Sequence, residues 1–420
     1  MIKTETDTNY GKILKCALDI GEQMLISGTE VGRVEDSIIR ICKAYGAVRV
    51  DVLSITSSII ATVEAPNGDC VTQTRRIMNR TNDLMRIEAL NRLSRKICET
   101  TPGLEEIKAE LARINTMKPM RWYVAALAAV IVASSFTAFF GGTWRDAVAA
   151  GLAGIVVFSF ERGAGRMKSN RIVFNLLASV LGGAFSVASV RIGIGENLDF
   201  IMIGVIMLLI PGMAITGAIE DLLMGDTITG LLRLCESIIA ACAIAAGFAL
   251  STYICGATEL INLKNTGDPD KLIQLTMALI SALGFALKLG MKRPTRLATA
   301  AVGGLIGWGA YLLSIHLGCD DFAACFIAAA TGALYSQIMA RTMHAPATVF
   351  LVPAIIPLVP GRALYYTLSS LLHSRPDLVS GWGATTALEA LAIALGMVVV
   401  LIAVSAVVAA ARKISLRKNG

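Results

Sequence analysis

Two short stretches decide the architecture of this chain: LIPGMA at residues 209–214 and LVPGRA at residues 358–363, which lie 149 residues apart. Each stretch sits within a long apolar run, where its proline removes a backbone hydrogen-bond donor and its glycine weakens the helix. A second pair, Gly183-Ala184 and Gly332-Ala333, repeats the same 149-residue offset. The shared offset indicates an internal repeat in which each copy contains a broken helix.

Hydrophobic residues make up 55% of the chain and charged residues only 16%, which is too apolar for two or three soluble domains. The excess begins near residue 120, where apolar runs become long enough to cross a hydrocarbon core of about 30 Å. The sequence therefore predicts a soluble domain over residues 1–117, followed by membrane spans. The ten predicted spans cover residues 122–140, 147–160, 172–190, 200–223, 231–254, 272–289, 297–315, 322–339, 345–372 and 384–411.

The distribution of Lys and Arg predicts the orientation of these spans. With the N-terminus inside the cell, 13 basic residues fall in the internal loops and C-terminal tail, and five fall in the external loops. Residues 1–9 are polar and acidic and lack the apolar segment of a signal peptide. We therefore expect a multi-pass protein of the cell membrane with both termini in the cytoplasm. The formal charge of +7 then reflects orientation in the bilayer and not nucleic-acid binding.

Each predicted half of the membrane region has five spans, over residues 118–260 and 261–420. Because five is an odd number, the two copies must cross the membrane in opposite directions. The predicted fold is an all-α polytopic membrane protein of two inverted five-helix repeats, with a small α+β cytoplasmic N-terminal domain. Many secondary transporters with this arrangement alternate between inward-open and outward-open states around a central site.

The N-terminal domain changes its apolar period along the chain. Apolar residues follow helical spacing over residues 10–27 and again in a second segment that Thr29 can cap. Over residues 48–74 the pattern changes to period-two alternation and β-rich runs. Two further helices are expected at residues 81–98 and 104–115. The domain contains no histidine, so a hydrolase would lack its commonest base. Its basic run suits a solvated face beside anionic lipid, with a ligand site as the alternative.

Breaks in the middle of a span expose backbone groups, and such breaks are tolerated where they line a cavity. We expect a substrate site at Pro211-Gly212 and Pro360-Gly361, the alternative being simple packing kinks. Arg362 is the deepest ionisable residue, and burying it costs roughly 2.5 to 3.5 kcal/mol unless it has a partner or a role. We predict that Arg362 holds a substrate carboxylate together with the amides after each break.

Acidic residues near the breaks are candidates for the substrate ammonium and for a coupling proton. Asp221 is predicted to serve either one, with an interfacial helix cap as the alternative. Glu236 and Glu389 occupy nearly equivalent places in the two halves and are predicted gates or proton relays. An ion pair between Glu236 and Arg233 on the neighbouring turn is the alternative for Glu236. The full set of predicted coupling or gating residues is Glu220, Asp226, Arg233, Glu236 and Glu389.

Several of these residues fall in longer motifs: LISGTEVGRVED at residues 25–36, IPG at 210–212, EDLLMGD at 220–226, then Gly230 and Arg233. In these motifs the chain resembles the threonine/serine exporter family in its single-chain form. It is also similar to two-subunit succinate exporters. The resemblance implies export of small amino acids driven by the proton gradient. It marks as family positions Glu30, Arg33, Glu35, Pro211, Gly212, Asp221, Gly225, Asp226 and Arg233.

The resemblance also implies a role for Glu30, Arg33 and Glu35 in latching the cytoplasmic domain to the transport core. A surface ion pair worth less than about 1 kcal/mol is the alternative. A dicarboxylate exporter is the nearest rival function, and it should need more cations than Arg362 and Arg233 supply. A membrane-anchored sensor or enzyme is the rival of another class. No cofactor or metal is implied, a homo-oligomer is compatible with the sequence, and the expected partners are the lipid bilayer, the substrate and a proton.

Overall fold

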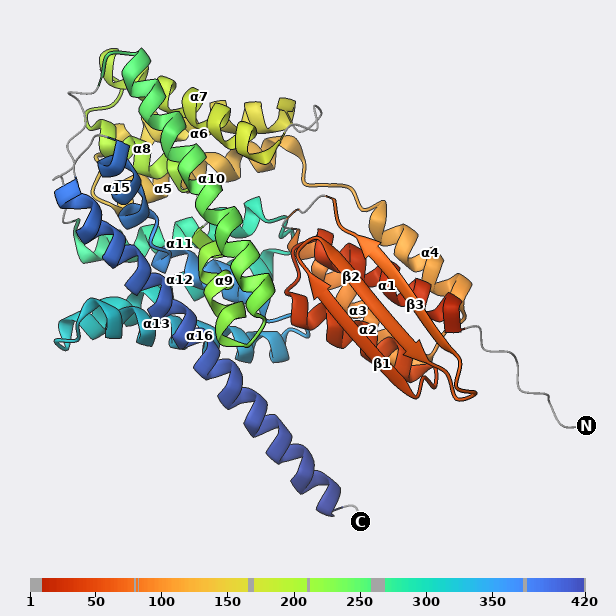
Figure 1. Cartoon of the computed structure of the whole chain (residues 1–420). Coiled ribbons are helices and arrows are strands. Elements are labelled where there is room, and N and C mark those ends of the chain that lie inside the picture. The colour runs from red at the N-terminus through yellow and green to blue at the C-terminus, as the bar shows by residue number, and fades with distance from the viewer. Residues whose placement is uncertain are drawn as a thin grey trace, which may run out of the picture. The chain divides into compact units, whose positions relative to one another are not determined.

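The structure is a computed structural model of the chain, and it describes residues 10–78, 81, 83–164, 170–209, 212–257, 269–372 and 376–418. The chain divides into two compact units, Met1–Pro119 and Met120–Gly420. Figure 1 labels the helices and strands of both units.

The N-terminal unit is an α+β domain. Its elements are α1 (Tyr10–Ile26), α2 (Val31–Ala44), β1 (Arg49–Ile55), β2 (Ser58–Glu64), β3 (Cys70–Arg76), α3 (Leu84–Thr100) and α4 (Leu104–Asn115). The three strands form one antiparallel sheet in the order β1-β2-β3. The predicted sheet is confirmed, but the predicted cap is wrong: α2 begins at Val31 and its N-cap is Glu30, because the chain is already extended there.

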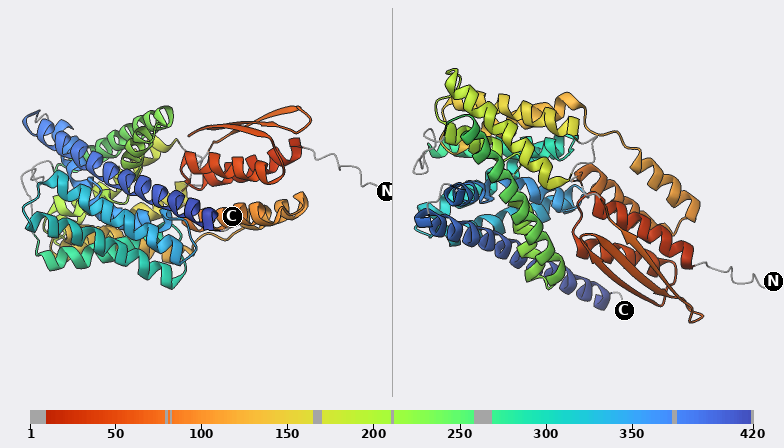
Figure 2. Two further views of the ribbon diagram at one scale, coloured as in Figure 1. Left: turned by 90° about the horizontal axis from the view of Figure 1, so that it is seen from below. Right: turned by 45° about the horizontal axis from the view of Figure 1, so that its top comes forward.

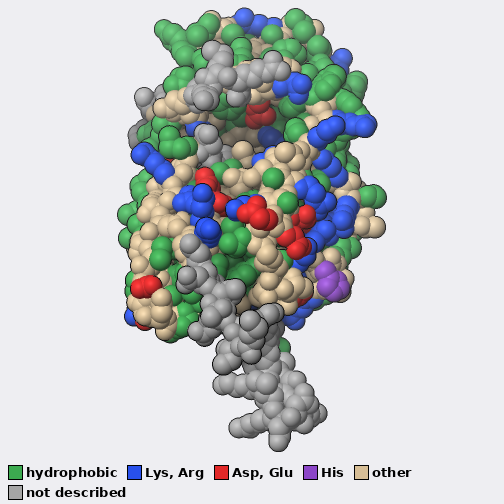
Figure 3. Space-filling view, turned by 90° about the vertical axis from the view of Figure 1, so that its right-hand side faces the viewer, with side chains coloured by type: hydrophobic (Ala, Val, Ile, Leu, Met, Phe, Trp, Pro, Cys, Tyr) green, Lys and Arg blue, Asp and Glu red, His purple; other side chains and the backbone are tan. Residues whose placement is uncertain are grey.

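Alternate residues of β2 build the core of this unit. Ile59, Ala61 and Val63 are fully buried and belong to a cluster that includes the apolar stripes of α1 and α2. A Cβ added to Gly21 would lie 2.7 Å from Cδ1 of Ile38, so the glycine lets α1 and α2 approach closely. Exposed ion pairs such as Lys96–Glu106 cover the outside, and Figure 3 shows Lys and Arg side chains beside Asp and Glu side chains.

The second unit is entirely helical within the described residues (Figure 2). Its elements are α5 (Trp122–Phe139), α6 (Trp144–Ala164), α7 (Arg171–Arg191), α8 (Leu198–Ile206), α9 (Gly212–Leu223), α10 (Thr227–Ile254), α11 (Lys271–Lys288), α12 (Pro294–His316), α13 (Asp321–Thr342), α14 (Thr348–Ile355), η2 (Ile356–Leu358), α15 (Gly361–Leu372) and α16 (Pro376–Lys418). Large apolar side chains remain exposed on it, among them Leu127, Leu177 and Leu388. Such a surface suits contact with lipid.

Eight helices in the described part of the chain are long and apolar enough to cross a membrane. A ninth span arises if the segments Thr348–Leu358 and Gly361–Leu371, which meet at an angle of 52°, are taken together. The protein is therefore a multi-pass membrane protein. The predicted span over residues 200–223 corresponds to α8 and α9, and Ile210 and Pro211 between them lie outside the described residues. Ten spans and an inverted repeat stay predictions.

Candidate substrate site

The second predicted break is a bent helix pair. Pro353 lies inside α14 and Pro357 inside η2, and neither can donate a backbone hydrogen bond. Val359 then turns to an extended conformation, with φ −54° and ψ 131°, and α15 starts at Gly361. The first amides of α15 therefore point out of the helix end next to Arg362. The sequence motif predicted this break correctly.

The first predicted break follows α8, which ends at Ile206 and is succeeded by a turn over residues 207–209. Pro211 lies outside the described residues, and α9 starts at Gly212. In a continuous helix the carbonyl of Leu208 would accept from the amide four residues later. Here it accepts a hydrogen bond from Nζ of Lys288 at 2.7 Å. Sequence reasoning placed Lys288 only among the loop charges and missed this contact.

The two breaks touch one another. A Cβ added to Gly361 would overlap Sδ of Met207, so the start of α15 packs directly against the turn that ends α8. Close by, the hydroxyl of Tyr365 donates to Sδ of Met202 at 3.8 Å, and both side chains are buried. Two segments 154 residues apart, 207 and 361, therefore meet where both backbones leave the helical path.

Arg362 projects from the first turn of α15 and is half-buried. Its guanidinium carbon lies 5.6 Å from the centre of the Phe140 ring, a cation–π contact. The charge of Arg362 also acts on the carboxylate of Glu389 in α16. The hydroxyls of Thr367 and Thr386 lie 3.3 Å apart, and Leu364 shares a buried cluster with Ala390, so α15 and α16 run antiparallel with Arg362 and Glu389 toward the same end of the pair.

Asp221 and Arg233 form a buried ion pair between α9 and α10. Nη1 of Arg233 lies 2.8 Å from Oδ2 of Asp221, and the two side chains are only 14% and 10% exposed. Glu236, the alternative partner of Arg233, is exposed one turn further along. The structure thus joins two of the predicted site residues to each other and not to the breaks.

The motif around Asp221 builds a helical hairpin. Gly225 has φ +95°, which favours glycine, and the backbone amide of Asp226 donates to the carbonyl of Asp221 at 2.9 Å as α9 ends. A Cβ on Gly230 would lie 2.8 Å from the carbonyl oxygen of Ala218, so α9 and α10 pack backbone to backbone. The family-like spacing of these residues therefore has a structural explanation: a tight turn, a close crossing and an ion pair.

The three predicted latch residues make contacts within the N-terminal unit. Nη2 of Arg33 lies 3.7 Å from Oε2 of Glu30. Oε1 of Glu35 accepts a hydrogen bond from the backbone amide of Ser54 in β1 at 2.6 Å. These contacts tie α2 to its own domain. The latch itself stays a prediction.

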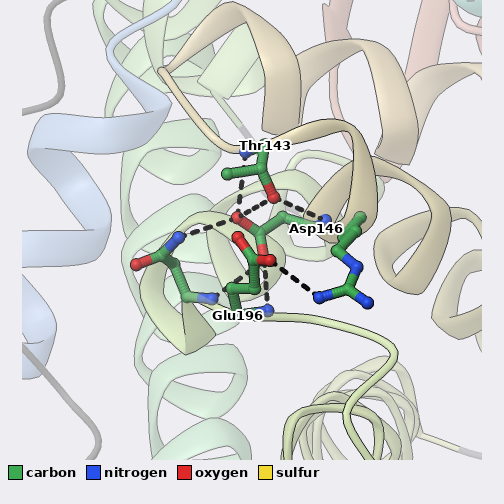
Figure 4. Close-up of polar contacts among 5 residues, drawn as sticks. Thr143, Asp146 and Glu196 are labelled. Carbon is green, nitrogen blue, oxygen red and sulfur yellow. Dashed lines mark hydrogen bonds and ion pairs between the residues drawn. The ribbon is translucent and has the colours of Figure 1, made fainter.

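Sequence reasoning missed Asp146, a fully buried carboxylate in the first turn of α6. It accepts hydrogen bonds from the backbone amides of Thr143, Glu196 and Asn197 at 2.7 to 2.9 Å. It also accepts from the hydroxyl of Thr143 and the side-chain amide of Asn197, each at 3.0 Å. Figure 4 shows this network, with the Arg145–Glu196 ion pair beside it.

The Asp146 network fastens the loop before α8 to the start of α6. Threonine three residues before aspartate at a helix start is a local capping signal that could have identified Thr143 and Asp146. The amides of Glu196 and Asn197, 50 and 51 residues away, carry no such signal. Within the described residues no group of three or more His, Cys, Asp or Glu side chains could hold a metal ion.

Long apolar helices, a sharply bent helix pair and an arginine at the bend define a multi-pass membrane transporter. Residues 15–255 match the family described as putative threonine/serine exporter, and residues 274–403 match a second model described as threonine/serine exporter. The chain belongs to the threonine/serine exporter family, and it is a membrane exporter and not an enzyme.

Two relatives illustrate the range of this similarity. A probable threonine/serine exporter of Mycobacterium tuberculosis is 26% identical over 410 residues, covering 93% of this chain and 75% of that protein. The probable succinate transporter subunit YjjP of Klebsiella aerogenes is 21% identical over 221 residues, covering 52% of this chain and 83% of that protein. No solved structure matches the chain.

Proposed function

We propose that the protein exports small zwitterionic amino acids of the threonine and serine type, driven by the proton gradient. The observation that carries this proposal is Arg362 at the start of α15. The helix dipole places partial positive charge at that end, where a further cation is unfavourable unless an anion balances both. A substrate carboxylate is the anion that an exporter of amino acids brings to this position. The name of the mycobacterial relative, a probable threonine/serine exporter, supports the same substrate class.

The alternative substrate is a dicarboxylate, which the name of the Klebsiella relative suggests. Two carboxylates call for two cations in the pathway. Arg233 is held by Asp221 at 2.8 Å, and Lys288 already donates to the Leu208 carbonyl at 2.7 Å, so both are poorly placed to bind a second carboxylate. The acidic residues around the breaks, Glu220 and Glu389, would also repel a dianion. This balance favours a substrate with one carboxylate and one ammonium.

The ion pair changes the role that we propose for Asp221. A carboxylate already held by an arginine is a weak candidate for the substrate ammonium or for a coupling proton, because the guanidinium stabilises its charged form. Glu389, which lies at the same end of the α15–α16 pair as Arg362, is the better candidate for proton coupling. Glu220, Asp226 and Glu236 are proposed as gating residues near the ends of α9 and α10.

The inverted repeat is part of the proposed mechanism, and matched glycine contacts support it. A Cβ on Gly247 would lie 2.5 Å from the carbonyl oxygen of Leu176, and one on Gly396 would lie 2.5 Å from that of Phe326. These positions are offset by 149 and 150 residues, so α10 packs on α7 as α16 packs on α13. The starts of the helices show nearly the same offset, since α5 and α11 begin 149 residues apart and α6 and α12 begin 150 residues apart.

Purified protein in lipid vesicles tests the proposed function. Labelled threonine and labelled succinate would be followed separately under an imposed pH gradient and with the gradient collapsed. We expect threonine to move and its movement to follow the gradient, with succinate excluded. Movement of succinate alone would favour the alternative substrate, and movement of neither would overturn the assignment.

The proposed orientation has its own test. Both termini are proposed to be cytoplasmic, and one proposed span, over residues 272–289, separates Lys264 from Lys292. Single cysteines at Lys264 and Lys292, labelled from outside intact cells, should react only at position 264. Equal labelling at both positions would contradict the inverted arrangement.

A further inference from the structure

Lys288 holds an unusual position for a charged residue. It is the last residue of α11, and its side chain is only 24% exposed. Its ammonium group donates to the carbonyl of Leu208 at 2.7 Å, at the C-terminal end of the broken helix α8. A helix end of this kind carries partial negative charge, and unwound carbonyls at such ends bind cations in other transporters.

Lys288 has a second partner within reach. Oε1 of Glu161 in α6 lies 3.9 Å from the same ammonium nitrogen, and the Glu161 side chain is 29% exposed. The lysine therefore has two partners of different kinds, a backbone carbonyl at hydrogen-bond distance and a carboxylate slightly too far for one. A small rotation of the four-carbon side chain would exchange the short contact for the longer one.

The carbonyl of Leu208 also lies beside the proposed carboxylate position. Met207 packs against Gly361, and Arg362 follows directly. Because the two helix ends meet here, an amino acid whose carboxylate binds the first amides of α15 would have its ammonium group directed toward the end of α8. The substrate ammonium and the ammonium of Lys288 have the same chemistry, a compact cation with three donors.

We propose that Lys288 is a tethered cation that occupies the ammonium position of the substrate site and moves toward Glu161 when a substrate binds. This inference rests on the proposed function and adds the second half of the zwitterion site. When no substrate is bound, the tethered ammonium balances the partial negative charge at the end of α8. The empty transporter can therefore change back to its other state. Lys288 is in this sense a positioning residue that competes with the substrate.

The other charges around Lys288 are consistent with this role. On the elements that pack against α11, Arg296 is buried at the start of α12, and Lys292 and Arg293 precede it. Glu161 is the acidic residue that the structure places near the lysine. Among the described residues, Glu161 is the carboxylate toward which a cation leaving the Leu208 carbonyl can move.

Exchange of labelled threonine across vesicles without a pH gradient tests the proposal, with KM and turnover measured separately. In Lys288→Gln the competitor is gone, so KM for threonine should fall at least threefold while net export under a pH gradient falls at least tenfold. In Glu161→Gln the lysine loses its alternative partner, so KM should rise severalfold. Lys292→Gln, an exposed lysine in the adjacent loop, should match the wild type.

A purely structural helix cap predicts different results. Lys288→Gln would then lower thermal stability with KM unchanged or raised, and Glu161→Gln would leave KM unchanged, and either result overturns the inference. If Lys288→Gln does not fold, Glu161→Gln alone decides. Absence of threonine exchange by the wild type would instead contradict the proposed function, so the two failures can be told apart.

Discussion

The α9–α10 and α15–α16 hairpins occupy equivalent positions in the proposed repeat, but they are closed by different interactions. Asp221 and Arg233 form a buried ion pair in the first hairpin. The residues 149 positions later are Ser370 and Trp382, and there the Trp382 ring packs on Tyr366 with centroids 4.9 Å apart. The same backbone geometry is thus stabilised once by charge and once by aromatic packing. The second hairpin instead carries an arginine at its start, Arg362, which is half-buried and lies over the Phe140 ring.

In the proposed repeat, Arg362 stands where the first copy has Met213. The first hairpin, whose Asp221 and Arg233 pair with each other, can serve as a scaffold. The second hairpin, with Arg362 at the break, can bind an anion. Four predictions test this contrast, from the largest expected effect to the smallest.

Arg233→Met should destabilise the protein most. It leaves Asp221 buried without its partner, and breaking a buried pair in this way costs about 3–5 kcal/mol. The free energy of unfolding, measured by SDS titration in mixed micelles, checks it. Glu236→Gln, an exposed site one turn away on α10, should change it by less than about 0.5 kcal/mol. Equal stability of Arg233→Met and wild type would show that the pair does not close the hairpin.

Ser370→Asp should destabilise the protein, because it places a carboxylate equivalent to Asp221 in the second hairpin without an arginine equivalent to Arg233. Ser370 is fully buried and its hydroxyl has no hydrogen-bond partner among the described residues, so we expect a loss of about 3 kcal/mol. Adding Trp382→Arg should then restore about 1 kcal/mol of it, although the aromatic packing is lost. The same unfolding measurement applies. No restoration in the double variant would mean that the hairpins are not equivalent.

Arg362→Ala should lower threonine flux about 100-fold, equivalent to about 2.7 kcal/mol, because helix amides cannot replace a full charge. The variant should unfold at the wild-type temperature, since Arg362 is only half-buried. Arg362→Lys keeps the charge but not the planar donors, and it should retain part of the flux. Vesicle uptake of labelled threonine measures all three proteins, and wild-type flux in Arg362→Ala would make the arginine structural.

Gly247→Ala and Gly396→Ala should have small and similar effects. In each case the new Cβ would lie 2.5 Å from a backbone oxygen of the neighbouring helix, and such overpacking costs about 1–3 kcal/mol. Thermal unfolding of the two variants gives the comparison. Gly163→Ala, with nothing within 4 Å of its Cβ, is the matched control and should be neutral or slightly stabilising. A large difference between the first two variants would argue against an internal repeat.

Hydropathy and the two Pro-Gly motifs were sufficient to predict a separate α+β unit at the N-terminus, most of the spans and the second break. These features depend on local composition, since a long apolar run needs lipid and a proline interrupts its own helix. The period change near residue 48 likewise predicted a small antiparallel sheet, which has three strands. Boundaries and features of this kind are encoded within a few turns of the chain.

The partners of the charged residues could not be predicted in the same way. Arg233 could pair with Glu236 on its own helix or with Asp221 on the preceding one, and only the close crossing at Gly230 decides between them. The contact between Lys288 and Leu208 spans 80 residues and depends on where the α8 end lies. Such choices follow from packing between helices, which composition does not specify.

Asp146 has a consequence for where the molecule can bend. Its carboxylate accepts three hydrogen bonds from Glu196 and Asn197 in the loop before α8, and all three would have to break for that loop to move away from α6. The start of α8 is therefore fixed to α6. The turn after Ile206, whose Leu208 carbonyl accepts from Lys288, has no such carboxylate network in the described residues and is the easier place for this segment to bend.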